Sequence, residues 1–160
     1  MTQDGPVATE ERAALEELYR QTGGKLWRAL TAYTLDPEVA KDAVAEAFTQ
    51  VLGRGSDIRH PEAWVWRAAF KIAAGELKKR STRGVVETDL VAQMPEQVVD
   101  VLAALRQLPA RQRAVVVFHD YADRPADEIA RTLGVTRATV YVHLSEGRRR
   151  LRRMLEDQDG

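Results

Sequence analysis

Hydrophobic residues along this chain recur at the spacing of α-helices, and no segment alternates in the manner of a β-strand. Polar and charged residues fill the positions between them, so each helix is expected to have an apolar face and a polar face. The pattern therefore predicts an all-α protein. The expected helices cover residues 9–34, 37–52, 61–80, 96–107, 110–121, 125–133 and 136–155.

Local signals support this division. Asp36 and Pro37 supply a capping carboxylate followed by a proline at the first helical position. Residues 81–95 lose the periodicity and contain a glycine and a proline, which is typical of a linker. We expect one small helical domain over residues 1–80, a flexible linker over 81–95 and a second helical domain over 96–160.

The C-terminal part of the pattern is typical of a helix-turn-helix motif. Ile129 and Leu133 form the inner face of a first helix, Gly134 permits a sharp turn, and Val140 packs the second helix onto the first. A helix held in this way can enter the major groove of DNA. The positions left to face bases are Thr136, Arg137, Thr139, Tyr141, Val142, His143, Ser145 and Glu146. The cations expected beside phosphates are Arg148, Arg149, Arg150, Arg152 and Arg153. The alternative, an αα-hairpin with a solvated arginine-rich end, explains fewer of these positions.

Charge is balanced overall but segregated along the chain. The 24 basic residues equal the 24 acidic residues in number. Acidic residues crowd the first 46 positions, whereas arginine and lysine crowd residues 67–83 and 148–153. This segregation fits a protein that meets an acidic polymer with one surface and a basic protein groove with another.

Composition also excludes several classes of site. Cysteine is absent, so the chain forms neither disulfides nor thiolate metal sites. The three histidines lie far apart in the sequence, which gives a zinc site no support. There is no glycine-rich phosphate loop and no nucleophile–base pattern, so we expect no cofactor, no metal and no catalytic residue. The sequence lacks a signal peptide and any run of 18 apolar residues, which predicts a cytoplasmic protein without membrane contact.

A second basic surface is expected on the third helix. Arg67, Lys71 and Lys78 fall on one helix face, and Trp64 lies beside it. An aromatic ring can stack on an unpaired base while cations hold the backbone. Core packing is the alternative role for Trp64, and it is the role that we expect of Trp66.

The second helix carries an acidic face. Asp42, Glu46 and Gln50 recur every four residues, opposite the apolar stripe. Without further information, this pattern is equally typical of a solvated helix face and of a surface that docks onto a basic protein partner.

Three segments, in this order, resemble the extracytoplasmic-function (ECF) group of the sigma-70 family of RNA polymerase sigma factors. The first is DPEVAKDAVAEAFTQVL, residues 36–52, which is similar to the helix that binds the polymerase clamp. The second is PEAWVWRAAFKIAAGELKKR, residues 61–80, which is similar to the helix that reads the minus-ten element. The third is LPARQRAVVVFHDYADRPADEIARTLGVTRATVYVHLSEGRRRLRR, which is similar to the domain that reads the minus-thirty-five element. The resemblance covers roughly residues 12–155. The alanine- and arginine-rich composition of these segments indicates an actinobacterial member.

The resemblance implies a fold and a set of partners. A three-helix bundle like sigma domain 2 and a four-helix domain like sigma domain 4 would bind core RNA polymerase and promoter DNA. Asp42, Glu46 and Gln50 would contact the clamp helices of the largest subunit, and the second domain would meet the flap of the second-largest. An anti-sigma factor is a further partner that the sequence does not identify. The residues implied at the minus-ten element are Arg54, Ser56, Asp57, Arg59, His60, Trp64, Arg67, Lys71 and Lys78.

Several residues depart from the family's pattern. Tyr141, Val142, His143 and Glu146 stand where basic or serine residues are frequent, and Lys71 and Gly75 replace an asparagine and an aspartate. These departures predict an unusual or weakly read minus-thirty-five sequence and leave the promoter consensus open. Two other functions remain as alternatives: a stand-alone helix-turn-helix regulator, and a sigma-like protein that has lost promoter activity.

Overall fold

The computed structural model describes residues 6–81 and 96–158, so nearly all of the expected linker lies outside the described residues. The described residues form helices joined by short turns, and none of these helices is long and apolar enough to cross a membrane. The main helices are α1 (Pro6–Thr34), α2 (Pro37–Arg54), α3 (Pro61–Ser81), α4 (Glu96–Arg106), α5 (Ala110–Val116), α6 (Ala126–Leu133) and α7 (Arg137–Gln158). Two short turns, η1 (Gly55–Asp57, 3-10) and η3 (Val117–Tyr121, π-helical), complete them.

All seven expected helices are present, and the differences lie at their ends. Helix α2 continues to Arg54 and leads into η1, so the expected loop after residue 52 is partly helical. The helix expected over 110–121 is an α-helix only to Val116 and then widens into the π-helical turn, where the Ala122 N–H donates to the Val117 carbonyl at 3.0 Å.

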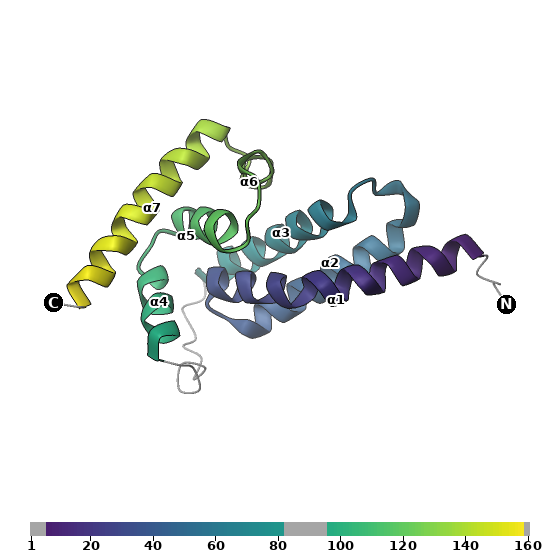
Figure 1. Ribbon diagram of the computed structural model, residues 1–160, viewed down its shortest axis with the longest axis horizontal. Helices are drawn as coiled ribbons and strands as arrows, with labels where there is room; N and C mark the ends of the chain where they lie inside the picture. The colour runs from purple at the N-terminus through teal and green to yellow at the C-terminus, as the bar shows by residue number, and fades with distance from the viewer. Residues whose placement is uncertain (1–5, 82–95, 159–160) are drawn as a thin grey trace.

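Helices α1, α2 and α3 form a bundle at the N-terminal end of the molecule (Figure 1). The predicted cap of α2 is confirmed: one Asp36 carboxylate oxygen accepts from the backbone N–H groups of Glu38 at 2.9 Å and Val39 at 3.3 Å. The apolar face of α2 is buried, and its members include Val39, Ala43, Val44, Ala47 and Val51. Trp66 on α3 is also buried, which confirms the predicted core role.

Helices α4 to α7 form the second domain. Helix α5 runs through its middle, and the long α7 packs along it on the side away from α1–α3 (Figure 1). Gly147 of α7 lies directly against α5, where a Cβ atom would come within 2.8 Å of Val116 Cγ2. This close approach sets how α7 crosses α5.

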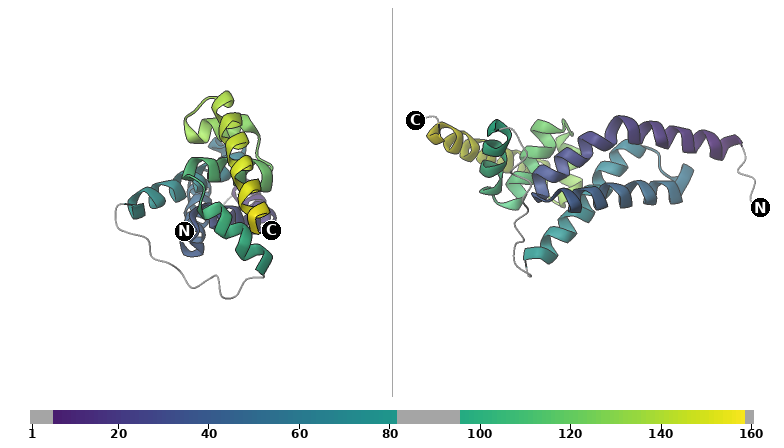
Figure 2. Two further views of the ribbon diagram at one scale, coloured as in Figure 1. Left: turned by 90° about the vertical axis from the view of Figure 1, so that its left-hand side faces the viewer. Right: turned by 90° about the horizontal axis from the view of Figure 1, so that it is seen from below.

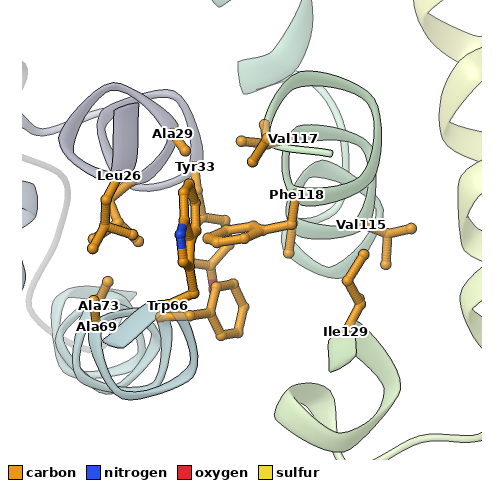
Figure 3. Packing of buried hydrophobic residues seen from close by; sticks show 14 of the residues in the cluster. Leu26, Ala29, Tyr33, Trp66, Ala69, Ala73, Val115, Val117, Phe118 and Ile129 are labelled. Atoms are coloured by element: carbon orange, nitrogen blue, oxygen red, sulfur yellow. The ribbon is translucent and has the colours of Figure 1, made fainter. Parts of the chain in front are cut away.

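Helices α4 to α7 pack against the bundle of α1, α2 and α3. Phe118 of η3 projects from the second domain into the first (Figure 3), where its ring lies 4.8 Å from Phe70, 5.7 Å from Trp66 and 6.5 Å from Tyr33. These edge-on aromatic contacts lie in a continuous buried core that extends from α1 to α7.

Polar contacts surround this aromatic cluster. The buried Arg113 guanidinium donates from Nε to the Tyr33 carbonyl at 2.7 Å, across the boundary between the domains. Further contacts across the boundary are Arg28 Nε to Tyr121 Oη at 3.0 Å, Arg124 to Glu62 at 3.0 Å and Lys25 to Asp123 at 3.6 Å. Seen from two further directions, the second domain remains in contact with one end of the three-helix bundle (Figure 2).

Candidate nucleic-acid interface

The segment α6–turn–α7 has the geometry of a helix-turn-helix. Gly134 adopts φ 69° and ψ 34°, the left-handed conformation that favours glycine, and its N–H donates to the Ala130 carbonyl. The Thr136 hydroxyl accepts from the Thr139 N–H at 3.1 Å and so caps the start of α7. Val140 is fully buried between the helices, as the spacing predicts.

Most of the predicted base-facing residues lie on the outer side of α7. Thr136, Arg137, Tyr141, Val142 and Ser145 are exposed, with Tyr141 at 46% and Val142 at 54%. Thr139, His143 and Glu146 are instead half-buried. The assignment of all eight residues to DNA bases stays a prediction.

Arg137 is held by two neighbours. Its guanidinium lies 5.8 Å from the centre of the Tyr141 ring and 3.5 Å from a carboxylate oxygen of Asp127 on α6. A hydrogen bond with Tyr141 and the nearby Asp127 charge raise the pKa of Arg137. The side chain is still 63% exposed at the start of α7, where recognition helices contact bases.

Glu146 and His143 are less available than the sequence suggested. Gln112 of α5 donates to a Glu146 carboxylate oxygen at 3.1 Å, which turns that carboxylate toward the protein. The Nδ1 atom of His143 is buried and has no hydrogen-bond partner. The Gln112–Glu146 contact could not be predicted from helical spacing, because Gln112 lies 34 residues before Glu146.

Arg148 has a partner that sequence reasoning missed. Its guanidinium binds Asp120 of η3 with both Nε, at 2.8 Å, and a terminal nitrogen. The hydrogen bond from Arg148, followed by that from His119, holds the pKa of Asp120 below its usual value against the opposing effect of burial. The other arginines at the end of α7 are exposed: Arg149, Arg150, Arg152 and Arg153.

Most of the predicted minus-ten residues surround one hollow of about 320 Å³, which we call the basic hollow. It is lined by Arg54, Asp57, Arg59, His60, Trp64 and Arg67, together with Ile58, Ala63, Glu128 and Arg131. The Arg54 guanidinium lies 5.4 Å from the centre of the Trp64 ring. Lys71 and Lys78 are exposed farther along α3 and do not line it, and the Ser56 side chain lies outside the described ones.

Helix α6 contributes Glu128 and Arg131 to the basic hollow. Glu128 and Arg131 were not predicted for this surface, because they lie more than 60 residues after α3 begins and helical spacing does not relate them to it. The Arg124–Glu62 ion pair joins the segment just before α6 to the start of α3. The predicted minus-ten surface therefore faces the first helix of the helix-turn-helix.

The acidic face of α2 is present as predicted. Asp42 and Glu46 are exposed and Gln50 is half-buried, and the Gln50 amide donates to a Glu46 carboxylate oxygen at 3.3 Å. The opposite face of α2 is the buried apolar stripe, so this polar face is directed away from the core. Its role in polymerase binding stays a prediction.

Comparison with known proteins finds similar sequences among sigma factors. Residues 99–151 match the family model for sigma-70, region 4. The ECF RNA polymerase sigma factor SigL of Mycobacterium tuberculosis is 28% identical over 166 residues, which covers 94% of each chain.

Two solved structures share the fold. One is the sigma factor RpoE in complex with the anti-sigma factor NepR from Bartonella quintana, with a TM-score of 0.76 and 19% identity over 88% of this chain and 96% of that one. The other is CnrH in complex with the cytosolic domain of CnrY, with a TM-score of 0.71 and 19% identity over 94% and 93%. The helix-turn-helix and the basic hollow in one all-α chain agree with these matches: the chain is similar in sequence and fold to ECF sigma factors of the sigma-70 family.

Proposed function

We propose that this protein directs core RNA polymerase to promoters by binding two DNA elements with two separate surfaces. The observation that carries this proposal is that one chain combines the helix-turn-helix with the basic hollow. A simple regulator needs only the first of these surfaces.

Helix α7 is the proposed reader of the minus-thirty-five element. The capped start of α7 presents Arg137 and Tyr141 to the major groove, while Arg149 and the arginines after it neutralise phosphates. Phosphate contacts position the helix without reading sequence, so the base preference rests on the first three turns of α7.

The basic hollow is the proposed site of minus-ten recognition and strand opening. Unstacking a base costs a few kcal/mol, and stacking on an aromatic side chain returns about 1–3 kcal/mol. Trp64 is half-buried at the hollow and lies beside Arg54. The Trp64 ring can therefore stack on a base while the Arg54 guanidinium binds the DNA backbone.

Core RNA polymerase is the main protein partner. The acidic face of α2 is the proposed contact with the clamp helices of its largest subunit, and the second domain is the proposed contact with the flap of the second-largest. Complementary charge speeds and orients such docking more than it tightens it. Because the structural relative RpoE is bound to the anti-sigma factor NepR, an anti-sigma factor is a further proposed partner of this protein.

The protein acts in the cytoplasm together with the polymerase and has no catalytic centre of its own. Strand opening is driven by binding alone, and the polymerase supplies the chemistry. The alternative of a stand-alone regulator predicts a dimer on a two-fold symmetric operator. Co-purification with core polymerase and the absence of dimers in analytical ultracentrifugation would contradict that alternative.

Promoter-dependent transcription with purified core polymerase tests the function, and Trp64 tests the mechanism. We expect Trp64→Ala to retain binding to closed duplex but to lose permanganate reactivity at the minus-ten element, because the stacking partner is gone. Trp64→Phe keeps a ring and should restore much of the opening. Normal opening in the alanine variant would refute the stacking role.

A further inference from the structure

The basic hollow belongs to both domains. Residues 54–60, which run from the end of α2 through η1, and helix α3 supply one wall, and Glu128 and Arg131 of α6 supply the other. Its volume of about 320 Å³ falls within the range of roughly 300–1,000 Å³ that small-molecule sites occupy. The hollow in this form exists only while the domains are packed together.

Its charge favours an anion. Four arginines line the hollow against two carboxylates, and one of these, Glu128, is already bound by Arg124 at 2.8 Å. Within the described residues, Arg59, Arg67 and Arg131 have no ion-pair partner. Arginine is well suited to phosphate, because its planar fork donates two parallel hydrogen bonds to the oxygens.

The same hollow offers an aromatic surface. Trp64 lines it beside the guanidinium of Arg54, whose carbon lies 5.4 Å from the centre of the ring. An indole ring next to a cation accepts a flat heteroaromatic group by stacking, in the way that proteins hold unpaired bases. Phosphate-binding arginines and a stacking ring in one hollow fit a nucleotide better than a simple anion.

We propose that the basic hollow of the closed protein binds a free nucleoside phosphate, with the base on Trp64 and the phosphates between Arg59, Arg67 and Arg131. This inference rests on the proposed function, because the same hollow would otherwise receive a promoter base. The ligand requires α6 in place, so it stabilises the packed arrangement of the two domains and competes with promoter DNA. A nucleotide would thereby restrain the factor before it meets polymerase.

Calorimetric titration of the full-length free protein with ADP tests the proposal. We expect saturable one-to-one binding, and at least about a tenfold weaker affinity in Arg131→Ala, because a charged hydrogen bond is lost. Trp64→Ala should weaken ADP binding as well. Arg20→Ala, which removes an exposed arginine that does not line the hollow, is the matched control and should bind ADP normally.

Further arms separate the ligand classes. Pyrophosphate, which lacks a base, and adenosine, which lacks phosphate, should each bind at least about tenfold more weakly than ADP; equal binding of pyrophosphate would overturn the nucleotide assignment. No ADP binding at millimolar concentration, or unchanged affinity in Arg131→Ala, would overturn the site. Promoter-dependent transcription without ADP is measured in parallel. If the unaltered protein supports no promoter-dependent transcription, the proposed function is contradicted. If it supports transcription but does not bind ADP, only this inference is contradicted.

Discussion

Arg113 shows how one buried charge joins the two domains. Besides the Tyr33 carbonyl of α1, its guanidinium donates to the carbonyls of Leu108 at 3.2 Å and Leu105 at 3.4 Å. The Leu105 and Leu108 carbonyls belong to the end of α4 and the turn after it, so Arg113 closes that helix end as well. Burial lowers the pKa of Arg113 from its usual value, but an arginine stays protonated in a protein at neutral pH.

Replacing Arg113 by methionine should lower the free energy of unfolding by at least about 2 kcal/mol, because up to three buried carbonyl oxygens lose their donor. Urea unfolding followed by circular dichroism measures the change. Arg111→Met, at an exposed position two residues away, is the control and should alter stability by no more than about 0.5 kcal/mol. Similar losses in both variants would mean that the three carbonyl contacts contribute little.

The Asp120–Arg148 pair predicts a pH dependence. Because Arg148 lowers the folded-state pKa of Asp120 below 3.8, the pair stabilises the fold above the unfolded pKa, and this stabilisation is lost as the pH falls through the folded pKa. In Asp120→Asn, the free energy of unfolding should therefore fall less steeply as the pH decreases in the acid range. The change in slope should correspond to the uptake of at most one proton. Acid titrations of stability should show no such change in Asp100→Asn, an exposed acid on α4.

At the scale of elements, the helix-turn-helix is predicted by residues close together in the sequence, whereas the packing of α7 against α5 is not. Gly134 is required by its left-handed backbone, and Val140 by its buried position between α6 and α7. Gly147 is required for a different reason, since any side chain there meets α5. The sequence marks Gly134 by its place between two helices, whereas Gly147 sits inside a helix with no local signal.

Gly147→Ala should destabilise the protein although alanine is the better helix former. A Cβ atom 2.8 Å from Val116 Cγ2 forces α7 away from α5, and such overpacking costs typically about 1–3 kcal/mol. Adding Val116→Ala should recover stability relative to the sum of the two single changes, because the clashing methyl is removed. Gly75→Ala is the control: nothing lies within 4 Å of its Cβ position, so it should gain up to about 1 kcal/mol.

At the scale of the whole molecule, the packed arrangement and the proposed function require different shapes. The proposed minus-ten and minus-thirty-five elements are, by their numbering, about 25 base pairs apart, or roughly 85 Å of duplex at about 3.4 Å per base pair. In the structure, α6 instead faces the basic hollow, and Phe118 is inserted among the rings of the first domain. The aromatic cluster and Arg113 contact must therefore separate when both elements are bound.

Energy transfer between two dyes measures this separation. Cysteine is absent from the chain, so Gln21→Cys on α1 and Gln107→Cys after α4 provide two exposed labelling positions. We expect high transfer efficiency in the free protein and a large decrease when core polymerase and promoter DNA are added together. Duplex DNA alone should leave the efficiency unchanged. Constant efficiency in a complex that transcribes would show that the domains stay packed during initiation.

Local patterns in the sequence were sufficient to predict the helices, the Asp36 cap, the turn at Gly134 and the burial of Val140 and Trp66. Each depends on neighbours within about four residues, and helical geometry relates such neighbours directly. The exposed faces of α2 and α7 follow for the same reason. The candidate site was therefore largely predictable as a set of residues, although its internal contacts were not.

Only the tertiary structure showed that Asp120 binds Arg148, that Gln112 binds Glu146, and that Arg131 joins the basic hollow. These partners lie tens of residues apart, and their pairing depends on how helices cross and how the two domains dock. Packing between helices is decided by the combined shapes of many side chains. Spacing along the chain therefore predicts which faces are apolar or charged, but the docked fold decides which of those faces meet.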